Sequence, residues 1–305
     1  MVAACVAAGG LLVAACAAAP PSPTVRLTGA EIAVLTSSGG SAVAAAEVNN
    51  AVELLVQRCM RAKGLVYYPL ILTAAQELNG IGLAGVPQAP IGLAAREANG
   101  YGFYSRAVQA AANPGQAGPG REQSYANSAP HSYLLALLGP ENQRVSWTLP
   151  GGDSGSSQTG GCRGAAERRV YGSVANRVLA TTGLSDLTSQ LQDAVTTDPA
   201  YTSVIARWSA CLARRGYKYA NPEDLWNRLS GRIDAAPTPA LRNLEIKTSV
   251  ADYKCAAAVR LLATIRALED SHARYMSKAL AGDLARITQI LARALKVAKA
   301  MRVAG

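Results

Sequence analysis

The chain holds six cysteines, and their spacing suggests the chemistry of disulfide formation. Cys59 and Cys211 each begin the same phrase, C-x4-G-x2-Y followed by a proline, and Cys162 and Cys255 come later in the chain, each in a helical setting. Four cysteines outside an export signal predict two disulfides in an oxidising compartment. Three pairings are possible, and the most economical one joins Cys59 to Cys162 and Cys211 to Cys255. The alternative is free thiols buried in a helical core.

A serine-protease site is the most tempting catalytic interpretation. Gly152-Asp153-Ser154-Gly155 is similar to the sequence around the nucleophile of chymotrypsin-like proteases. That chemistry needs a histidine that takes the serine proton and an acid that orients the histidine. The two histidines, His131 and His272, lack the surroundings that those proteases use, and the tetrapeptide lies in a Gly/Ser-rich stretch where chance matches are common. We therefore expect no catalytic residues here.

Other catalytic and cofactor patterns are equally weak. The cysteines show no C-x2-C spacing and the histidines are far apart, so we expect no metal site and no cofactor. No glycine-rich loop follows a strand and opens a helix, as nucleotide binding requires. Adjacent acids such as Glu223-Asp224 and Glu269-Asp270 point about 100° apart on a helix, so they do not converge on a glycosidic bond. The sequence leans away from an enzyme without excluding one.

Four tyrosines, Tyr67, Tyr68, Tyr217 and Tyr219, follow the two phrases. We expect them to pack beside the disulfides with their hydroxyls at the surface, and the alternative is that they line a ligand groove.

The N-terminus predicts export. Residues 1–16 are apolar and small, and Val13-Ala14-Ala15-Cys16 is similar to a bacterial lipobox, whose cysteine receives a lipid anchor. The alternative is cleavage after Ala17-Ala18-Ala19 and release as a secreted protein. No charge precedes Arg26, whereas an export signal begins with Lys or Arg, so we expect the natural start to lie upstream. Residues 17–45, rich in Pro, Gly, Ser and Ala, predict a flexible tether.

The rest of the chain has helical periodicity and predicts a mainly α fold of two quasi-repeated, disulfide-linked units, 46–182 and 183–305, with long irregular loops in the middle. Asp198-Pro199 and Asn221-Pro222 have the composition of helix starts, and Gly64 and Gly216 stand where helix C-terminal glycines belong. Residues 150–161 predict a flexible loop. From Glu245 the pattern is helical almost to the end, interrupted by Gly282 alone.

The charge of the chain, +10 over 305 residues with a pI near 9.5, favours anionic partners. The predicted C-terminal helix is amphipathic, with an apolar side and a basic face made of Arg286, Arg293, Lys296 and Lys299. Contact of this face with lipid headgroups or an anionic envelope polymer is one interpretation. The others are a face that meets only solvent and pairing with a partner helix. Export argues against nucleic acid as a partner.

Several phrases together resemble a group of exported actinobacterial proteins that are named as lipoproteins or secreted proteins and have no assigned activity. They are the two C-x4-G-x2-Y phrases, the Gly100-Tyr101-Gly102 turn, GC-x2-A-A-E-x2-V-Y-G from Gly161, and a late cysteine before a long helix. The resemblance covers most of residues 47–270. It implies export, a mostly helical fold and paired cysteines, and it implies no activity. The uncharged start departs from the usual signal of that group.

We therefore expect a protein anchored by lipid to the outer face of the cytoplasmic membrane, or secreted, that binds a ligand or serves as a scaffold in the cell envelope. The alternatives are a hydrolase of wall polymers or peptides with an unrecognised site, and a structural oligomer formed through helices.

Overall fold

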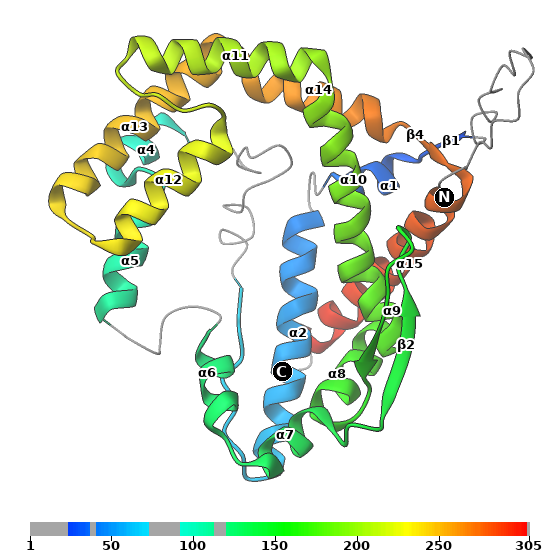
Figure 1. Ribbon diagram of the computed structural model, residues 1–305. Coiled ribbons are helices and arrows are strands. Elements are labelled where there is room, and N and C mark those ends of the chain that lie inside the picture. Colours follow the sequence, from blue (N-terminus) through cyan, green and yellow to red (C-terminus); the bar gives the residue numbers. More distant parts are fainter. Residues whose placement is uncertain (1–23, 37–40, 73–91, 113–119, 304–305) are drawn as a thin grey trace, which may run out of the picture.

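A computed structural model describes residues 24–36, 41–72, 92–112 and 120–303. The predicted export signal, Cys16 and part of the predicted tether lie outside the described residues. The fold is mainly α, as the sequence predicts, with two short antiparallel ribbons and a long C-terminal helix (Figure 1). None of the described helices combines the length and the apolar character that a membrane span requires.

The helices build two apolar cores. One core gathers around Trp208, Leu229 and Ile265, and we call the helices around it the α13 lobe. This lobe contains α1 (Gly29–Leu35), α4 (Leu93–Asn99), α5 (Phe103–Ala112), α10 (Leu184–Thr197), α11 (Pro199–Arg214), α12 (Pro222–Ala235), α13 (Pro239–Ala258) and α14 (Leu261–Ala273).

The other core surrounds Val56, Met60 and Val170, and we call its helices the α2 lobe. They are α2 (Ser41–Ala62), α6 (Gly120–Ser128), α7 (His131–Leu138) and α8 (Gly161–Tyr171). The short α9 (Val174–Val178) and the π-helical turn η2 (Leu179–Gly183) lead from α8 to α10. Figure 1 shows α2 beside α8, with α12 and α13 above and to the left and α10 above and to the right.

The helix α15 (Lys278–Val303) joins the two lobes, because its apolar side serves both cores. Leu284 and Ile287 enter the core of the α13 lobe, and Ala294 and Ala298 enter that of the α2 lobe. The predicted amphipathic pattern is confirmed, since this stripe is buried and the basic face is exposed. Because these apolar side chains are buried against other helices, they cannot also insert into a lipid bilayer.

The repeated phrase gives the same helix end twice. The N–H of Leu65 bonds to the carbonyl of Met60, and that of Tyr217 bonds to the carbonyl of Leu212, each at 3.0 Å. Gly64 and Gly216 take φ values of 74° and 88° between these groups. Both ends are therefore Schellman motifs, which need a residue that tolerates positive φ.

The two disulfides join Cys59 to Cys162 and Cys211 to Cys255, with Cα atoms 5.6 and 5.7 Å apart. This is the pairing that the sequence analysis favoured, and two disulfides indicate an oxidising compartment. The similarity of the two units ends there. Cys162 lies in the first turn of α8, whereas Cys255 lies in the last turn of α13, so the partner helices are attached by opposite ends.

Part of the predicted tether is folded. The strand β1 (Thr24–Arg26) pairs with β4 (Tyr275–Ser277), and α1 follows with the Thr28–Glu31 capping box. Leu35 at the end of α1 is fully buried. The flexible tether over 17–45 is therefore corrected for residues 24–36, where a short apolar helix completes the core of the α13 lobe, and for residues 41–45, which belong to α2.

Two further expectations are corrected. The predicted loop at 150–161 contains half of a hairpin, in which β2 (Arg144–Thr148) pairs with β3 (Ser154–Gln158). The C-terminal pattern breaks at Arg260, which has a φ of 57°, and at β4, whereas Gly282 lies within α15. In addition, α4 and α5, from the first predicted unit, pack against α13 and α12 of the second.

We predict that the Cys59–Cys162 disulfide stabilises the fold more than Cys211–Cys255, because it closes a loop of 103 residues rather than 44. Loop entropy predicts losses of about 5 and about 4 kcal/mol in the free energy of unfolding when each pair is replaced by alanine. Urea unfolding of the two double variants measures both losses. The reverse order would contradict the entropic account.

Candidate functional site

A polar face of α13 is buried inside the protein. Glu245, Thr248, Ser249 and Asp252 recur at helical spacing, and each is at most 9% exposed. A buried carboxylate is costly unless donors surround it, so the partners of these side chains show what the face holds in place.

Glu245 binds the start of α5. Its Oε1 accepts the N–H groups of Tyr101 and Phe103 at 2.9 and 2.8 Å, and its Oε2 accepts that of Tyr104 at 3.0 Å. A carboxylate from α13 therefore serves as the N-cap that Gly102 cannot supply. Gly100 makes this approach possible, because a Cβ there would lie 2.7 Å from Glu245 Cγ. Its φ of 62° is a second reason for glycine at this position.

Asp252 binds three other elements. Its Oδ2 accepts from Arg96 Nη1 of α4 and from the Tyr101 hydroxyl, both at 2.8 Å. Its Oδ1 accepts from Trp208 Nε1 of α11 at 2.9 Å. Burial, and after it the charge of Asp252, raises the pKa of the Tyr101 hydroxyl, so this group remains a donor. The Arg96–Asp252 pair is thus an internal ion pair, surrounded by hydrogen-bonding groups.

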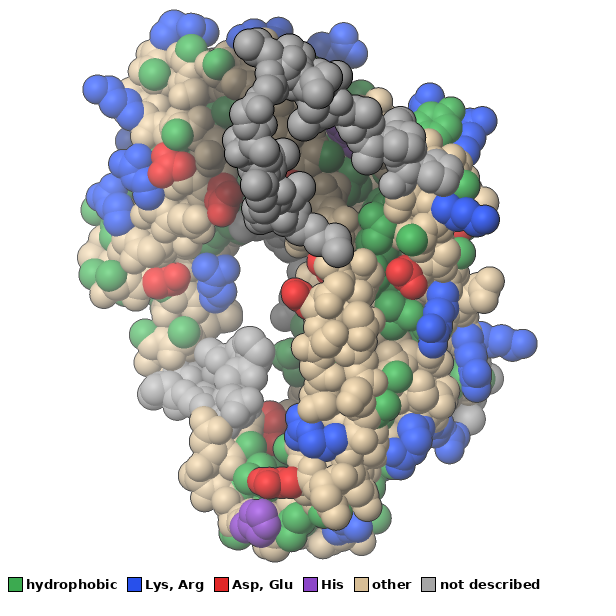
Figure 2. Space-filling model, turned by 45° about the vertical axis from the view of Figure 1, so that its right-hand side comes forward, with side chains coloured by type: hydrophobic (Ala, Val, Ile, Leu, Met, Phe, Trp, Pro, Cys, Tyr) green, Lys and Arg blue, Asp and Glu red, His purple; other side chains and the backbone are tan. Residues whose placement is uncertain are grey.

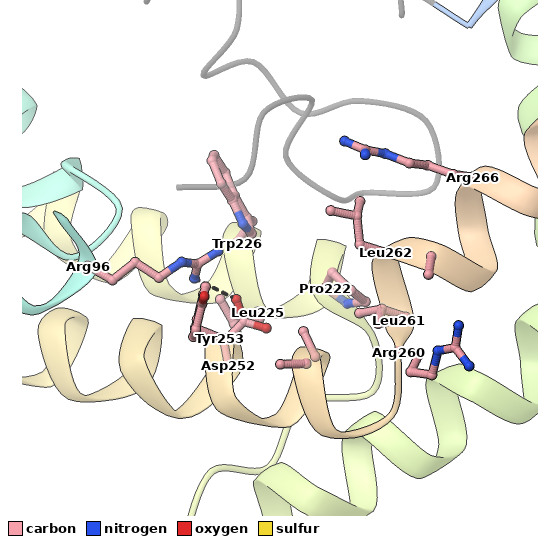
Figure 3. Close-up of a pocket in the computed structure, with 13 residues that line it drawn as sticks. Arg96, Pro222, Leu225, Trp226, Asp252, Tyr253, Arg260, Leu261, Leu262 and Arg266 are labelled. Carbon is pink, nitrogen blue, oxygen red and sulfur yellow. Dashed lines mark hydrogen bonds and ion pairs between the residues drawn. The ribbon is translucent and has the colours of Figure 1, made fainter. Parts of the chain in front are cut away.

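A pocket of about 450 Å³ opens directly beside this ion pair. Its walls come from three helices, with Leu225 and Trp226 on α12, Tyr253 and Ala256 on α13, and Leu262 and Arg266 on α14 (Figure 3). The Trp226 ring is held from behind by Phe103, edge to face, with ring centroids 4.9 Å apart. The start of α5 that Glu245 binds therefore supports one wall of the pocket.

Three arginines and one acid line the pocket. Arg96 is neutralised by Asp252, whereas Arg260 and Arg266 are exposed on α14 and at its start. In Figure 3 the Arg266 side chain extends above Leu262, and that of Arg260 lies on the side away from Trp226. Arg260 is the N-cap of α14, and its side chain accepts no hydrogen bond from the N–H groups of the first turn. The unpaired charges at this site are therefore positive.

A third buried carboxylate, that of Glu53, organises the α2 lobe. Glu53 accepts from the Tyr67 hydroxyl at 2.8 Å, from Leu70 N at 3.0 Å and from Arg163 Nη1 at 3.0 Å. Burial is the main cause that raises the pKa of Tyr67. The expectation of surface hydroxyls is therefore wrong for Tyr67, whose hydroxyl completes an internal network beside the Cys59–Cys162 disulfide.

The protease-like residues do not converge. Ser154 lies in β3 with its Oγ 3.1 Å from Thr148 Oγ1, and His131 is exposed at the start of α7. His272 Nε2 instead lies 3.0 Å from Asp198 Oδ2, the N-cap of α11, whose pKa is lowered by the Ala200 N–H and then by His272. Within the described part of the chain, no group of three or more His, Cys, Asp or Glu residues could hold a metal ion.

The basic face of α15 lies over the junction of α8 and α9. Arg286 donates to Asn176 Oδ1 at 3.4 Å, and the Arg293 guanidinium lies against Gly172, which ends α8. Lys296 and Lys299 are exposed farther along the helix. Lys and Arg side chains outnumber acids over the right-hand part of the face in Figure 2. Contact with anionic envelope material stays a prediction.

No family model, curated protein or solved structure matches this chain. The inference of function therefore depends on the site itself.

Sequence reasoning missed the pocket and its polar floor. Arg96 and Asp252 are 156 residues apart, and nothing in the local pattern links them. One signal was present, because Glu245, Ser249 and Asp252 recur on one face of a helix that also carries a disulfide cysteine.

We predict that Glu245→Ala lowers the free energy of unfolding by about 3 kcal/mol, because three N–H groups at the start of α5 lose a charged acceptor. Urea unfolding measures the loss. Glu97→Ala on exposed α4 surface is the matched control and should change stability by less than about 0.5 kcal/mol. Equal effects of the two variants would contradict the capping role.

A pH effect follows from Glu269 on α14. Burial raises its pKa from 4.5 to about 7, against the opposing charge of Arg266. Between these pH values the folded protein keeps a proton that the unfolded chain has released, so this carboxyl makes stability fall as pH rises from about 4.5 to about 7.

Glu269→Gln should remove that part of the pH dependence and raise the thermal midpoint at pH 8, whereas Glu141→Gln at an exposed position should change neither. Melting curves of the three proteins from pH 4 to 8 test this, and a Glu269→Gln curve parallel to that of the native chain would contradict it.

Proposed function

We propose that this protein is an exported binding protein of the cell envelope, anchored through Cys16, that holds a small ligand with an apolar body in the pocket between α12, α13 and α14. The observation that carries the proposal is the pocket itself, which combines an apolar lining with a fixed polar floor.

The size and lining of the pocket suit a small molecule. Ligand sites commonly enclose 300–1,000 Å³ and place a few polar groups among apolar walls, and this pocket of about 450 Å³ does both. Its floor is rigid, because Asp252 is bonded to Arg96, Tyr101 and Trp208 from separate elements. The Cys211–Cys255 disulfide ties α13 to α11 one residue before Ala256 enters the lining. A preformed site of this kind loses little entropy on binding.

The lining favours binding over hydrolysis. It contains no serine, threonine, cysteine, histidine or lysine among the described residues, so it supplies none of the usual nucleophile and base pairs. Asp252 is already engaged by three donors and cannot serve as a free base. These features support a binding role above that of the alternative hydrolase.

The location of the protein outside the cytoplasm is part of the proposal. Two disulfides suit an oxidising compartment, and the lipobox-like Val13-Ala14-Ala15-Cys16 with the resemblance to exported actinobacterial lipoproteins supports an anchor on the outer face of the membrane. A binding protein in that position would meet ligands that arrive from outside the cell or from the membrane.

A neutral fluorescent probe tests the pocket. N-phenyl-1-naphthylamine should bind the full chain at one site with a dissociation constant on the order of 10 µM, from roughly 0.4 kcal/mol per heavy atom. Ala263→Phe, which fills the pocket from α14, should weaken binding about 10-fold or more. Ala267→Phe places the same ring on the same helix outside the lining and should leave the affinity within 2-fold.

Absence of probe binding to the native chain would contradict the proposal. Equal affinities of the native chain and both variants would place the probe elsewhere and would contradict it as well.

A further inference from the structure

We propose that the ligand of this pocket is a single-chain amphiphile with an anionic head, its chain lying between Trp226 and Leu262 and its head at Arg266. This inference rests on the proposed binding function and adds the chemical class of the ligand.

The charge of the lining points to an anion. Of its four charged side chains, Arg96 and Asp252 neutralise each other across 2.8 Å in the floor. The remaining two, Arg260 and Arg266, are both cations, and no acid of the lining compensates them. The uncapped first turn of α14, which also lines the pocket, adds potential of the same sign. A cationic ligand would meet only Asp252, whose carboxylate oxygens are already bonded.

Arg266 is placed to meet the head of a ligand. Its side chain leaves α14 one turn beyond Leu262 and lies above it at the pocket in Figure 3, while Arg96 approaches from the opposite side. The acid that acts on Arg266 is Glu269, one turn along the same helix. Burial keeps the pKa of Glu269 near 7, so its charge is incomplete at neutral pH and Arg266 remains available to a second anion.

The backbone at the start of α14 is strained beside the pocket. Arg260 is the only residue other than glycine with positive φ in the described part of the chain, at 57°. This conformation costs an L-residue roughly 1 kcal/mol, and glycine would avoid that cost. Strained residues of this kind gather at functional sites, and Arg260 borders the pocket.

The composition of the apolar lining suits a flexible chain. Three leucines and three alanines form most of the wall, and Trp226 is the main flat surface. Aliphatic side chains on α12, α13 and α14 offer dispersion contacts along a flexible chain from three directions. The pocket volume of about 450 Å³ accommodates one chain of about ten carbons.

Displacement of N-phenyl-1-naphthylamine by decanoate and by decan-1-ol at pH 6, where Glu269 keeps its proton, tests the inference, because the two competitors share a chain length and differ in the head. We compare the native chain with Arg266→Gln. The variant should raise the decanoate concentration needed for half displacement about 5-fold, since one charge-assisted pair is lost. It should leave the decan-1-ol value within about 1.5-fold. Arg274→Gln changes an exposed arginine at the C-cap of α14, outside the lining, removes the same charge and should change neither value.

The outcomes separate this inference from the function on which it rests. If the probe binds and Arg266→Gln changes decanoate and decan-1-ol equally, or changes neither, the anionic head is refuted and the binding function stands. If Arg274→Gln reproduces the effect of Arg266→Gln, the effect is one of net charge and the inference is refuted in the same way. If the probe does not bind the native chain, the binding function itself fails.

Discussion

The burial of two carboxylates on one face of α13 is the constraint on which the α13 lobe depends. An unpaired carboxylate in a protein interior is strongly destabilising, so Glu245 and Asp252 require donors that the rest of the lobe must bring to them. The donors come from α4, from the turn before α5, from α5 itself and from α11. One helix therefore fixes the positions of three others by electrostatics, and the disulfide to α11 strengthens one of those attachments covalently.

The pocket is a consequence of this arrangement. Tyr253 and Ala256, one helical turn after Ser249 and Asp252, continue the face of α13 that borders the pocket, and α12 and α14 form its sides. The α12 wall is held through Trp226, which packs on Phe103 and Tyr101 in the segment that Glu245 binds. The same network that satisfies the buried acids thus keeps the cavity open, and it uses Arg96 in doing so. The cations that remain for a ligand are the ones that α14 supplies.

Features set by short-range physics could be predicted from the sequence. Helix starts at Asp198 and Asn221 follow from side chains that accept N–H groups two or three residues later, and helix ends at Gly64 and Gly216 follow from positive φ. The disulfide pairing followed from the order of the helices. The amphipathic pattern of α15 predicted correctly which side is buried, because its apolar stripe has a single period along the whole helix.

Features set by distant partners could not be predicted in this way. A polar stripe on α13 has the composition of a solvent-facing surface, and its burial is explained by donors from distant segments, such as Arg96 for Asp252 and the N–H of Phe103 for Glu245. Trp147 Nε1 donates to Ser157 Oγ across a hairpin whose second strand, β3, consists of Ser, Gly and Gln, a composition that predicts a loop. The Asp198–His272 contact joins an N-cap to a helix 74 residues away. The candidate site belongs almost entirely to this second class.

The most direct measurement is a crystal structure of the full chain with 10-bromodecanoate, in which anomalous scattering locates the bromine. The account predicts one strong bromine peak inside the pocket, among Leu225, Trp226 and Ala256, with the carboxylate density at Arg266. A bromine peak outside this pocket, or a pocket left empty at saturating ligand, would contradict it.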